Sequence, residues 1–282
     1  MPEVKNGKSW ASNCATALLS GLVVLAAVPA AASSIYAIDS RGDRLYRLDP
    51  ATGAATLVAP TSPPIVDPRG SGLAVEWATG RVFVSNLSWQ YYLGFEGWLG
   101  VLDTATGAVE VFGETLFSTT DPPRGVNGMA FARDGSLYGV AGSIPGIPWG
   151  LVKIDTGTGR AGDVVPLTGV TELWGLATDP SGTFFAVDRT SLYRLNTLGQ
   201  ATLIGPHGMA LGPDIESSIP LTLDRDGGRL LSIDSDDGRL FELDPTTGAA
   251  TLIGNTGIQA TGLVVLGAIQ VPTLGLGSLL AF

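Results

Sequence analysis

The sequence is poor in the residue types on which most site chemistry depends, with one His and one Cys among 282 residues. A single histidine, His207, without a nucleophile or a second ligand beside it supports neither a catalytic triad nor a zinc site. We therefore expect His207 in a solvent-exposed loop. No catalytic residue and no metal ligand is predicted from the pattern.

Charge of both signs is also scarce, because only 15% of the residues are charged and acidic residues outnumber basic ones 26 to 16. A surface with net negative charge offers little to a phosphate backbone, which excludes nucleic acid as an expected partner. Hydrophobic residues make up 45%, and the chain also has 39 Gly and 18 Pro. Such a chain is long enough to bury a full core and is divided by many turns.

The first 32 residues have the pattern of a secretory signal peptide. Lys5 and Lys8 form a positive region, and an apolar run at 15–28 follows, too short for a comfortable membrane span. Small residues at 30–32 predict cleavage between Ala32 and Ser33. Since the single cysteine, Cys14, lies in this leader, the exported chain is expected to contain no thiol and no disulfide.

After the leader, one turn motif recurs five times, each copy between two short apolar runs. In this motif Asp or Asn bonds its own backbone and Gly supplies a positive φ, so each copy predicts a β-hairpin. The copies are Asp49-Pro-Ala-Thr-Gly53, Asp103-Thr-Ala-Thr-Gly107, Asp155-Thr-Gly-Thr-Gly159, Asn196-Thr-Leu-Gly199 and Asp244-Pro-Thr-Thr-Gly248.

A second motif, usually a Gly followed by small and apolar residues, precedes most of these hairpins, and another strand lies between the two motifs. Its copies are Gly72-Leu-Ala-Val75, Gly128-Met-Ala-Phe131, Gly175-Leu-Ala-Thr178, the variant Pro220-Leu-Thr-Leu223, and Gly262-Leu-Val-Val265. Four strands per unit at a period of roughly 40–55 residues are typical of a β-propeller blade. The sequence therefore predicts an all-β fold, a five-bladed β-propeller of four-stranded blades over residues 33–266.

The first unit lacks its inner strand, which predicts how the ring closes. Three strands follow Ser33, with no Gly-Leu-Ala strand before them, whereas the strand at 261–266 has no hairpin after it. An unpaired inner edge is an aggregation hazard, so the two parts should share one blade. We therefore expect Val264 and Ile38 in adjacent strands of one sheet.

Residues 267–282 change character again. Val271-Pro-Thr-Leu274 and the short apolar run after it resemble, in truncated form, the IPTL-CTERM sorting signal of exported bacterial proteins, which is related to the signals processed by exosortases. The resemblance implies export to the periplasm, the cell surface or the medium. It implies membrane contact only through a segment that continues beyond Phe282.

The body of the chain separately resembles exported bacterial propeller-like repeat proteins. Leu45-Tyr-Arg-Leu-Asp-Pro-Ala-Thr-Gly-Ala-Ala-Thr-Leu-Val58 matches their repeat closely. This resemblance implies the fold, and a fold does not imply a function.

The links that lead into the inner strands contain the best candidate for a ligand site. In a propeller such links run towards the mouth of the central channel, so their polar side chains are expected to ring one opening, where a small ligand would bind. Salt bridges between neighbouring links are the structural alternative. The residues are Arg69, Arg124, Asn127, Glu172 and Glu216.

Two other stretches attract attention. Asp234-Ser-Asp236-Asp237-Gly238 offers several oxygens to Ca²⁺ or another divalent cation, but it lacks the spacing of an EF-hand loop, and a tight turn explains it better. The other stretch is an aromatic insertion in one blade, which forms a sugar- or partner-binding patch if exposed and a cap on the blade if folded back. Its members are Trp89, Tyr91, Tyr92, Phe95 and Trp98.

Two classes of function are consistent with this pattern. The first is a non-enzymatic exported surface or matrix protein, monomeric, that binds a protein or a carbohydrate at the cell surface through its loops and needs no cofactor. The second is a metal-dependent hydrolase resembling the lactonase propellers, for which Glu76, Asn127 and Glu172 are candidate ligands at the central channel. The shortage of catalytic residues favours the binding module.

Overall fold

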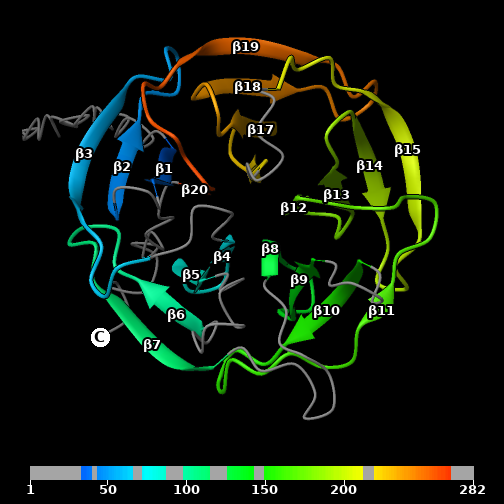
Figure 1. Ribbon diagram of the computed structural model, residues 1–282, viewed down its shortest axis with the longest axis horizontal. Coiled ribbons are helices and arrows are strands. Elements are labelled where there is room, and N and C mark those ends of the chain that lie inside the picture. The colour runs from blue at the N-terminus through cyan, green and yellow to red at the C-terminus, as the bar shows by residue number, and fades with distance from the viewer. Residues whose placement is uncertain are drawn as a thin grey trace, which may run out of the picture. The chain divides into compact units, whose positions relative to one another are not determined.

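The computed structural model describes residues 33–39, 43–65, 72–86, 98–114, 126–142, 149–211 and 219–267, all within the compact unit Ala31–Phe282. In these ranges the strands group into five four-stranded antiparallel sheets. The sheets stand in a ring, each with one strand towards the centre and one at the circumference (Figure 1). The predicted five-bladed β-propeller is therefore confirmed. No helix long and apolar enough to span a membrane occurs in the described ranges.

Blades 2 to 5 are each built from four consecutive strands, ordered from the centre outwards. Blade 2 contains β4 (Leu73–Glu76), β5 (Arg81–Asn86), β6 (Trp98–Leu102) and β7 (Val109–Glu114). Blade 3 contains β8 (Val126–Phe131), β9 (Leu137–Ala141), β10 (Gly150–Ile154) and β11 (Val165–Pro166). Blade 4 contains β12 (Gly175–Thr178), β13 (Phe184–Val187), β14 (Ser191–Leu195) and β15 (Ala201–Pro206). Blade 5 contains β16 (Leu221–Asp224), β17 (Arg229–Asp234), β18 (Arg239–Leu243) and β19 (Ala250–Asn255).

Blade 1 combines the two ends of the ring. Its order is β20 (Gly262–Leu266), β1 (Ser34–Asp39), β2 (Arg44–Leu48) and β3 (Ala55–Pro60). β20 pairs antiparallel with β1, with Tyr36 opposite Val264 and Ile38 opposite Gly262. This confirms that the C-terminal strand supplies the inner strand that the first unit lacks.

The repeated hairpin turns form as their residue types predict. In the first copy the Asp49 carboxylate accepts hydrogen bonds from the backbone N–H groups of Ala51 and Thr52, at 2.9 and 2.8 Å, and these bonds lower the pKa of Asp49. Gly53 closes the turn with φ +73°, in the left-handed region that favours glycine. Local chemistry therefore sets the spacing of the outer two strands in each blade.

The outer strands run along the circumference (Figure 1), and their ends join to form a belt. After β3, the Ser62 N–H donates to Gly107 O in the next blade (3.1 Å), and Val109 N–H donates back to Ser62 O (2.8 Å). Thr168 makes the same exchange with blade 4, at 2.9 Å in both directions. At the next seam, Ala250 N–H donates to His207 O at 2.9 Å. We call this arrangement the outer belt; it hydrogen-bonds neighbouring blades as well as strands within them.

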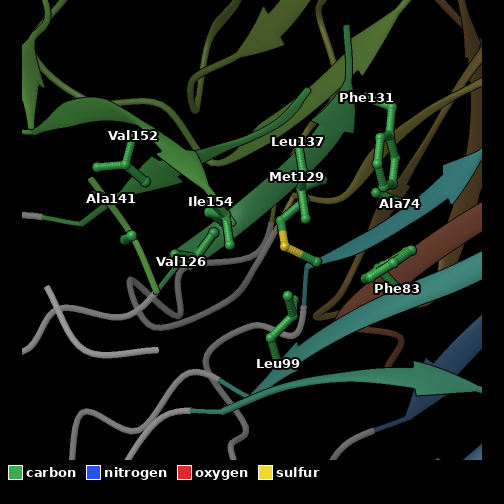
Figure 2. Close-up of a cluster of buried hydrophobic side chains, with 11 residues drawn as sticks. Ala74, Phe83, Leu99, Val126, Met129, Phe131, Leu137, Ala141, Val152 and Ile154 are labelled. Carbon is green, nitrogen blue, oxygen red and sulfur yellow. The ribbon is translucent and has the colours of Figure 1, made fainter. Parts of the chain in front are cut away.

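Between neighbouring blades the core is apolar and closely packed. Figure 2 shows one such cluster, in which Phe83 of β5 faces Phe131 of β8 at a ring-centroid distance of 5.2 Å. Phe83 is completely buried, and Met129 and Leu99 fill the space beside it. The apolar side chains on the two faces of each blade thus pack against the blade before it and the blade after it. This packing holds the inner strands in place around the axis.

Candidate ligand-binding site at one end of the ring

Glycines bring the inner strands close together where these strands begin. We call this end of the ring the upper end, and the end at which the inner strands finish the lower end. A Cβ atom on Gly72 would lie 2.7 Å from Asn127 O, and one on Gly128 would lie 2.5 Å from Leu176 N. Such distances are shorter than any side chain tolerates, so glycine at these positions lets adjacent inner strands meet.

The channel between the inner strands has almost no free volume. A cavity of about 20 Å³ lies among Leu73, Met129, Leu176, Leu221 and their neighbours, and a second of about 10 Å³ lies nearer the upper end. Such volumes hold about one water molecule. Among the described residues, a ligand larger than a water molecule therefore has no room between the inner strands.

At the upper end of blades 3 and 4, three side chains form a cluster with unmet hydrogen-bonding capacity. Trp149 and Trp174 meet edge to face, with ring centroids 5.0 Å apart. Asn127 is only 4% exposed. Among the described residues, neither the Asn127 Oδ1 atom nor the Trp174 Nε1 atom has a hydrogen-bond partner. We call Asn127, Trp149 and Trp174 the upper-end cluster.

Gly142 lies close to two members of this cluster, Asn127 and Trp149. A Cβ atom there would lie 3.8 Å from Asn127 Nδ2 and 3.8 Å from Cη2 of Trp149, which is ordinary van der Waals contact. The Asn127 amide and the Trp149 indole therefore lie near the same point. Glu172, half-buried, stands two residues before Trp174 on the same link into β12.

Two residues of the predicted opening are thus placed at one end of the ring, since Asn127 begins β8 and Glu172 precedes β12. Arg69, Arg124 and Glu216 lie outside the described residues, so their ligand-binding role stays a prediction. Sequence reasoning missed Trp149 and Trp174. The sequence did offer one signal for Trp174, because this residue directly precedes Gly175, the first residue of an inner strand.

Of the predicted aromatic patch, Trp98 alone lies within the described residues. It is partly buried and packs against the apolar cluster that contains Val82, Val84 and Leu102. Trp98 therefore belongs to the core of its blade. Trp89, Tyr91, Tyr92 and Phe95 lie outside the described residues.

The three residues considered for a lactonase-like metal site are not all at one end. Glu76 ends β4, at the lower end, and its carboxylate pairs with the Arg81 guanidinium at 2.9 Å. The hydrogen bond from Arg81 lowers the pKa of Glu76. Gly72, at the other end of β4, is the residue that meets Asn127. Glu76 is separated from Asn127 by the length of β4.

One contact crosses the ring at its lower end. The guanidinium carbon of Arg225, in the turn after β16, lies 4.1 Å from the ring centroid of Trp77, in the turn after β4. Blades 5 and 2 are not neighbours, so this cation–π contact spans the channel. Burial lowers the pKa of Arg225, and the Asp179 carboxylate of blade 4 partly offsets the effect.

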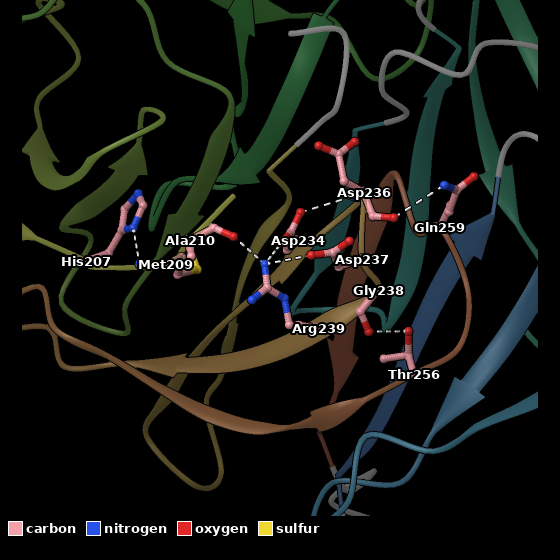
Figure 3. Close-up of polar contacts among 10 residues, drawn as sticks. All are labelled: His207, Met209, Ala210, Asp234, Asp236, Asp237, Gly238, Arg239, Thr256 and Gln259. Atoms are coloured by element: carbon pink, nitrogen blue, oxygen red, sulfur yellow. Dashed lines mark hydrogen bonds and ion pairs between the residues drawn. The ribbon is translucent and has the colours of Figure 1, made fainter. Parts of the chain in front are cut away.

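The acidic loop at 234–238 binds an arginine (Figure 3). The Arg239 Nη2 atom lies 2.5 Å from Asp234 Oδ2 and 3.0 Å from Asp237 Oδ2, and it also donates to Ala210 O. Gly238 has φ +68°, as the tight-turn interpretation requires. Within the described ranges, no group of three His, Cys, Asp or Glu residues is arranged to hold a metal ion.

The expectation that His207 lies exposed to solvent is wrong. His207 is 3% exposed, and its Nδ1 atom accepts a hydrogen bond from Met209 N–H at 3.1 Å (Figure 3). Its Nε2 atom lies 3.3 Å from Asp188 O, which assigns the proton to Nε2 in the neutral ring. The backbone of His207 also takes part in the outer belt, because its carbonyl accepts the hydrogen bond from Ala250 of blade 5.

His207 is expected to make folding depend on pH below neutrality. Burial lowers its pKa in the folded protein, whereas the unfolded chain takes up the proton near pH 6.5. The stability that neutral His207 provides is complete above about pH 6.5 and is lost as the pH falls towards the lowered pKa of the folded state. Urea midpoints at pH 7.5 and 5.5 measure this loss.

Since His207 is the only histidine, the His207→Gln variant is a clean control. Its urea midpoint should change much less over the same range, which lies above the titration of the exposed carboxylates. An unchanged midpoint in the unmodified protein would contradict the assignment of a buried, neutral ring.

Comparisons with known proteins bear on the fold. No protein-family model matches the sequence, and no curated protein matches it significantly. Among solved structures, the chain is similar to one from a nidogen/laminin complex, with a TM-score of 0.53 and 12% identity over 84% of this chain and 99% of that chain. A gluconolactonase from Xanthomonas campestris gives a TM-score of 0.49 and 14% identity over 83% of this chain and 79% of that chain. The similarity to the chain from the nidogen/laminin complex concerns the fold alone, because at 12% identity it says nothing about activity.

Proposed function

We propose that this chain is an exported, non-enzymatic binding module that holds a carbohydrate at the upper-end cluster. The observation that carries the proposal is the pair of buried atoms without partners among the described residues, Asn127 Oδ1 and Trp174 Nε1, beside the Trp149 ring. Buried polar groups are nearly always hydrogen-bonded, so an acceptor and a donor left open together favour a ligand that supplies both.

A sugar has the chemistry that this cluster lacks. Each hydroxyl group donates to an amide oxygen and accepts from an indole N–H, and the C–H face of the ring packs on an aromatic side chain. Glu172 lies two residues before Trp174 on the link into β12, and its carboxylate can accept hydrogen bonds from further hydroxyl groups of the sugar. The narrow channel is consistent with this interpretation, because in the described ranges it has no room for a sugar between the inner strands.

Export is proposed from the sequence pattern at both ends. The leader before Ser33 and the sorting-signal resemblance at Val271–Leu274 favour a protein that acts at the cell surface, in the periplasm or in the medium. Carbohydrates are abundant in those locations, and they are the partner class whose chemistry fits this cluster. The chain would act there as a monomer.

The substitution Trp174→Phe tests the site, because it removes one N–H group and keeps an aromatic ring. We expect the intact protein to bind members of an array of neutral and acidic oligosaccharides. Loss of one hydrogen bond to a buried partner should weaken that binding by about tenfold or more. Titration calorimetry with the best-bound oligosaccharide measures the change.

Trp77→Phe is the matched control, since it makes the same change at the lower end of the ring and should leave binding unaltered. Equal binding by the wild type and Trp174→Phe would place the ligand elsewhere. Hydrolysis of a lactone that needs a divalent cation and disappears in Glu172→Gln would favour the metal-dependent hydrolase instead.

A further inference from the structure

The first described residue of the chain lies against two carboxylates of another blade. The Ser33 hydroxyl donates to Asp224 Oδ1 at 2.8 Å and lies 3.3 Å from Asp226 Oδ2. Ser33 leads into β1 of blade 1, whereas Asp224 ends β16 of blade 5 and Asp226 lies in the turn between β16 and β17. The contact therefore joins the two blades that meet where the ring closes.

Asp224 is a buried carboxylate with no cation paired to it in the part of the chain that the structure describes. It is 7% exposed, and its Oδ1 atom also accepts hydrogen bonds from the backbone N–H groups of Asp226 and Gly227, at 3.2 and 3.1 Å. Across the described ranges, no lysine or arginine forms an ion pair with Asp224. Buried carboxylates are rarely left without an opposite charge.

The nearest arginine along the chain is engaged elsewhere. Arg225 directs its guanidinium to the Trp77 ring across the lower end of the ring. The end of β20 also reaches this turn, since a Cβ atom on Gly267 would lie 2.9 Å from Asp226 Oδ2. Both chain segments that form the shared blade therefore approach the same acidic turn.

We infer that leader removal at Ser33 supplies a cation for Asp224: the new α-ammonium group pairs with the Asp224 carboxylate and fastens blade 1 to blade 5. Cleavage between Ala32 and Ser33 hydrolyses one peptide bond and leaves a protonated amine on Ser33. The ammonium nitrogen is bonded to the Cα atom of Ser33. The Oγ atom of the same residue already contacts both carboxylates, so the nitrogen lies close to them. In the resulting ion pair donor and acceptor are both charged, whereas in the hydroxyl hydrogen bond that it joins only the acceptor is. The inference rests on one part of the proposed function, namely that the chain is exported and its leader removed.

The test uses the exported protein, secreted with its own leader and recovered from the periplasm of a bacterial host. N-terminal sequencing first establishes whether it starts at Ser33. Its thermal midpoint is then compared with that of a chain carrying one additional alanine before Ser33, which moves the ammonium group about 3.8 Å along the chain. We expect the extended chain to melt about 2–4 °C lower.

Asp224→Asn supplies the second arm of the test. In that background the added alanine should have little effect on the midpoint, because the charge on the partner is gone. A start at Ser33 with equal midpoints for the native and extended chains would overturn the inference and leave export intact. A start at Met1 or at another residue would overturn the predicted cleavage and this inference together, without bearing on the carbohydrate site.

Discussion

Ending the chain after Gly257 is expected to unfold the whole ring, whereas ending it after Gly267 should leave it nearly as stable as the intact protein. The first truncation removes β20, in which Leu263, Val264 and Val265 are at most 1% exposed. Burying each such side chain stabilises the fold by about 1.5–3 kcal/mol. The loss also leaves the inner edge of β1 unpaired. Together these effects approach the total stability of a typical domain, about 5–15 kcal/mol.

Circular dichroism and urea unfolding of the two truncated chains measure this difference. The second truncation is the matched control, since it keeps every residue of β20 and removes only the residues after Gly267. Similar melting of both chains would show that blade 1 does not need its C-terminal strand. An open arc of five units would then describe the solution state better than a closed ring.

Phe83→Ala should cost about 3–5 kcal/mol in the free energy of unfolding. The Phe83 side chain is fully buried between blades 2 and 3, where its ring contacts Phe131 at 5.2 Å and Phe112 at 6.2 Å. Phe131 is held in the sheet of blade 3, opposite Leu137, so its ring is not free to move into the cavity (Figure 2). Urea unfolding at pH 7.5 measures the loss.

Leu203→Ala is the control for this substitution, because Leu203 lies on the outer strand of blade 4 and is 59% exposed. It should change the free energy of unfolding by no more than about 0.5 kcal/mol. A small effect of Phe83→Ala would contradict the description of the seam between blades as closely packed.

The hairpins and the closure of the ring were predictable because their causes are local or countable. Asp49 and Gly53 make a turn through their own backbone, and the same holds wherever the motif recurs. The missing inner strand of the first unit could be found by counting, and its partner by looking for the unpaired copy at 261–266.

The candidate site was less predictable because it depends on which end of a strand a residue occupies and on contacts between blades. Glu76 and Asn127 both flank inner strands, but Glu76 ends its strand and Asn127 begins one, so they lie at different ends. Trp149 and Trp174 come from separate blades, and no spacing in the sequence indicates that their rings touch. His207 lies on a link between blades 4 and 5, but its ring is buried and contacts Asp188 O and Met209 N, which are not indicated by its flanking residues.

The pairing of β20 with β1 also determines how the ring responds to a pulling force. Ser34 is opposite Leu266, so both chain ends leave the same end of the same pair of strands. Tension applied between those two ends would break the hydrogen bonds of this pair one after another, as in unzipping, and not all at once, as in shearing. The closure that holds five blades against heat is thus the element that a mechanical load would open first. A force applied through a partner bound at the upper end would not pull directly on the chain ends that flank β1 and β20.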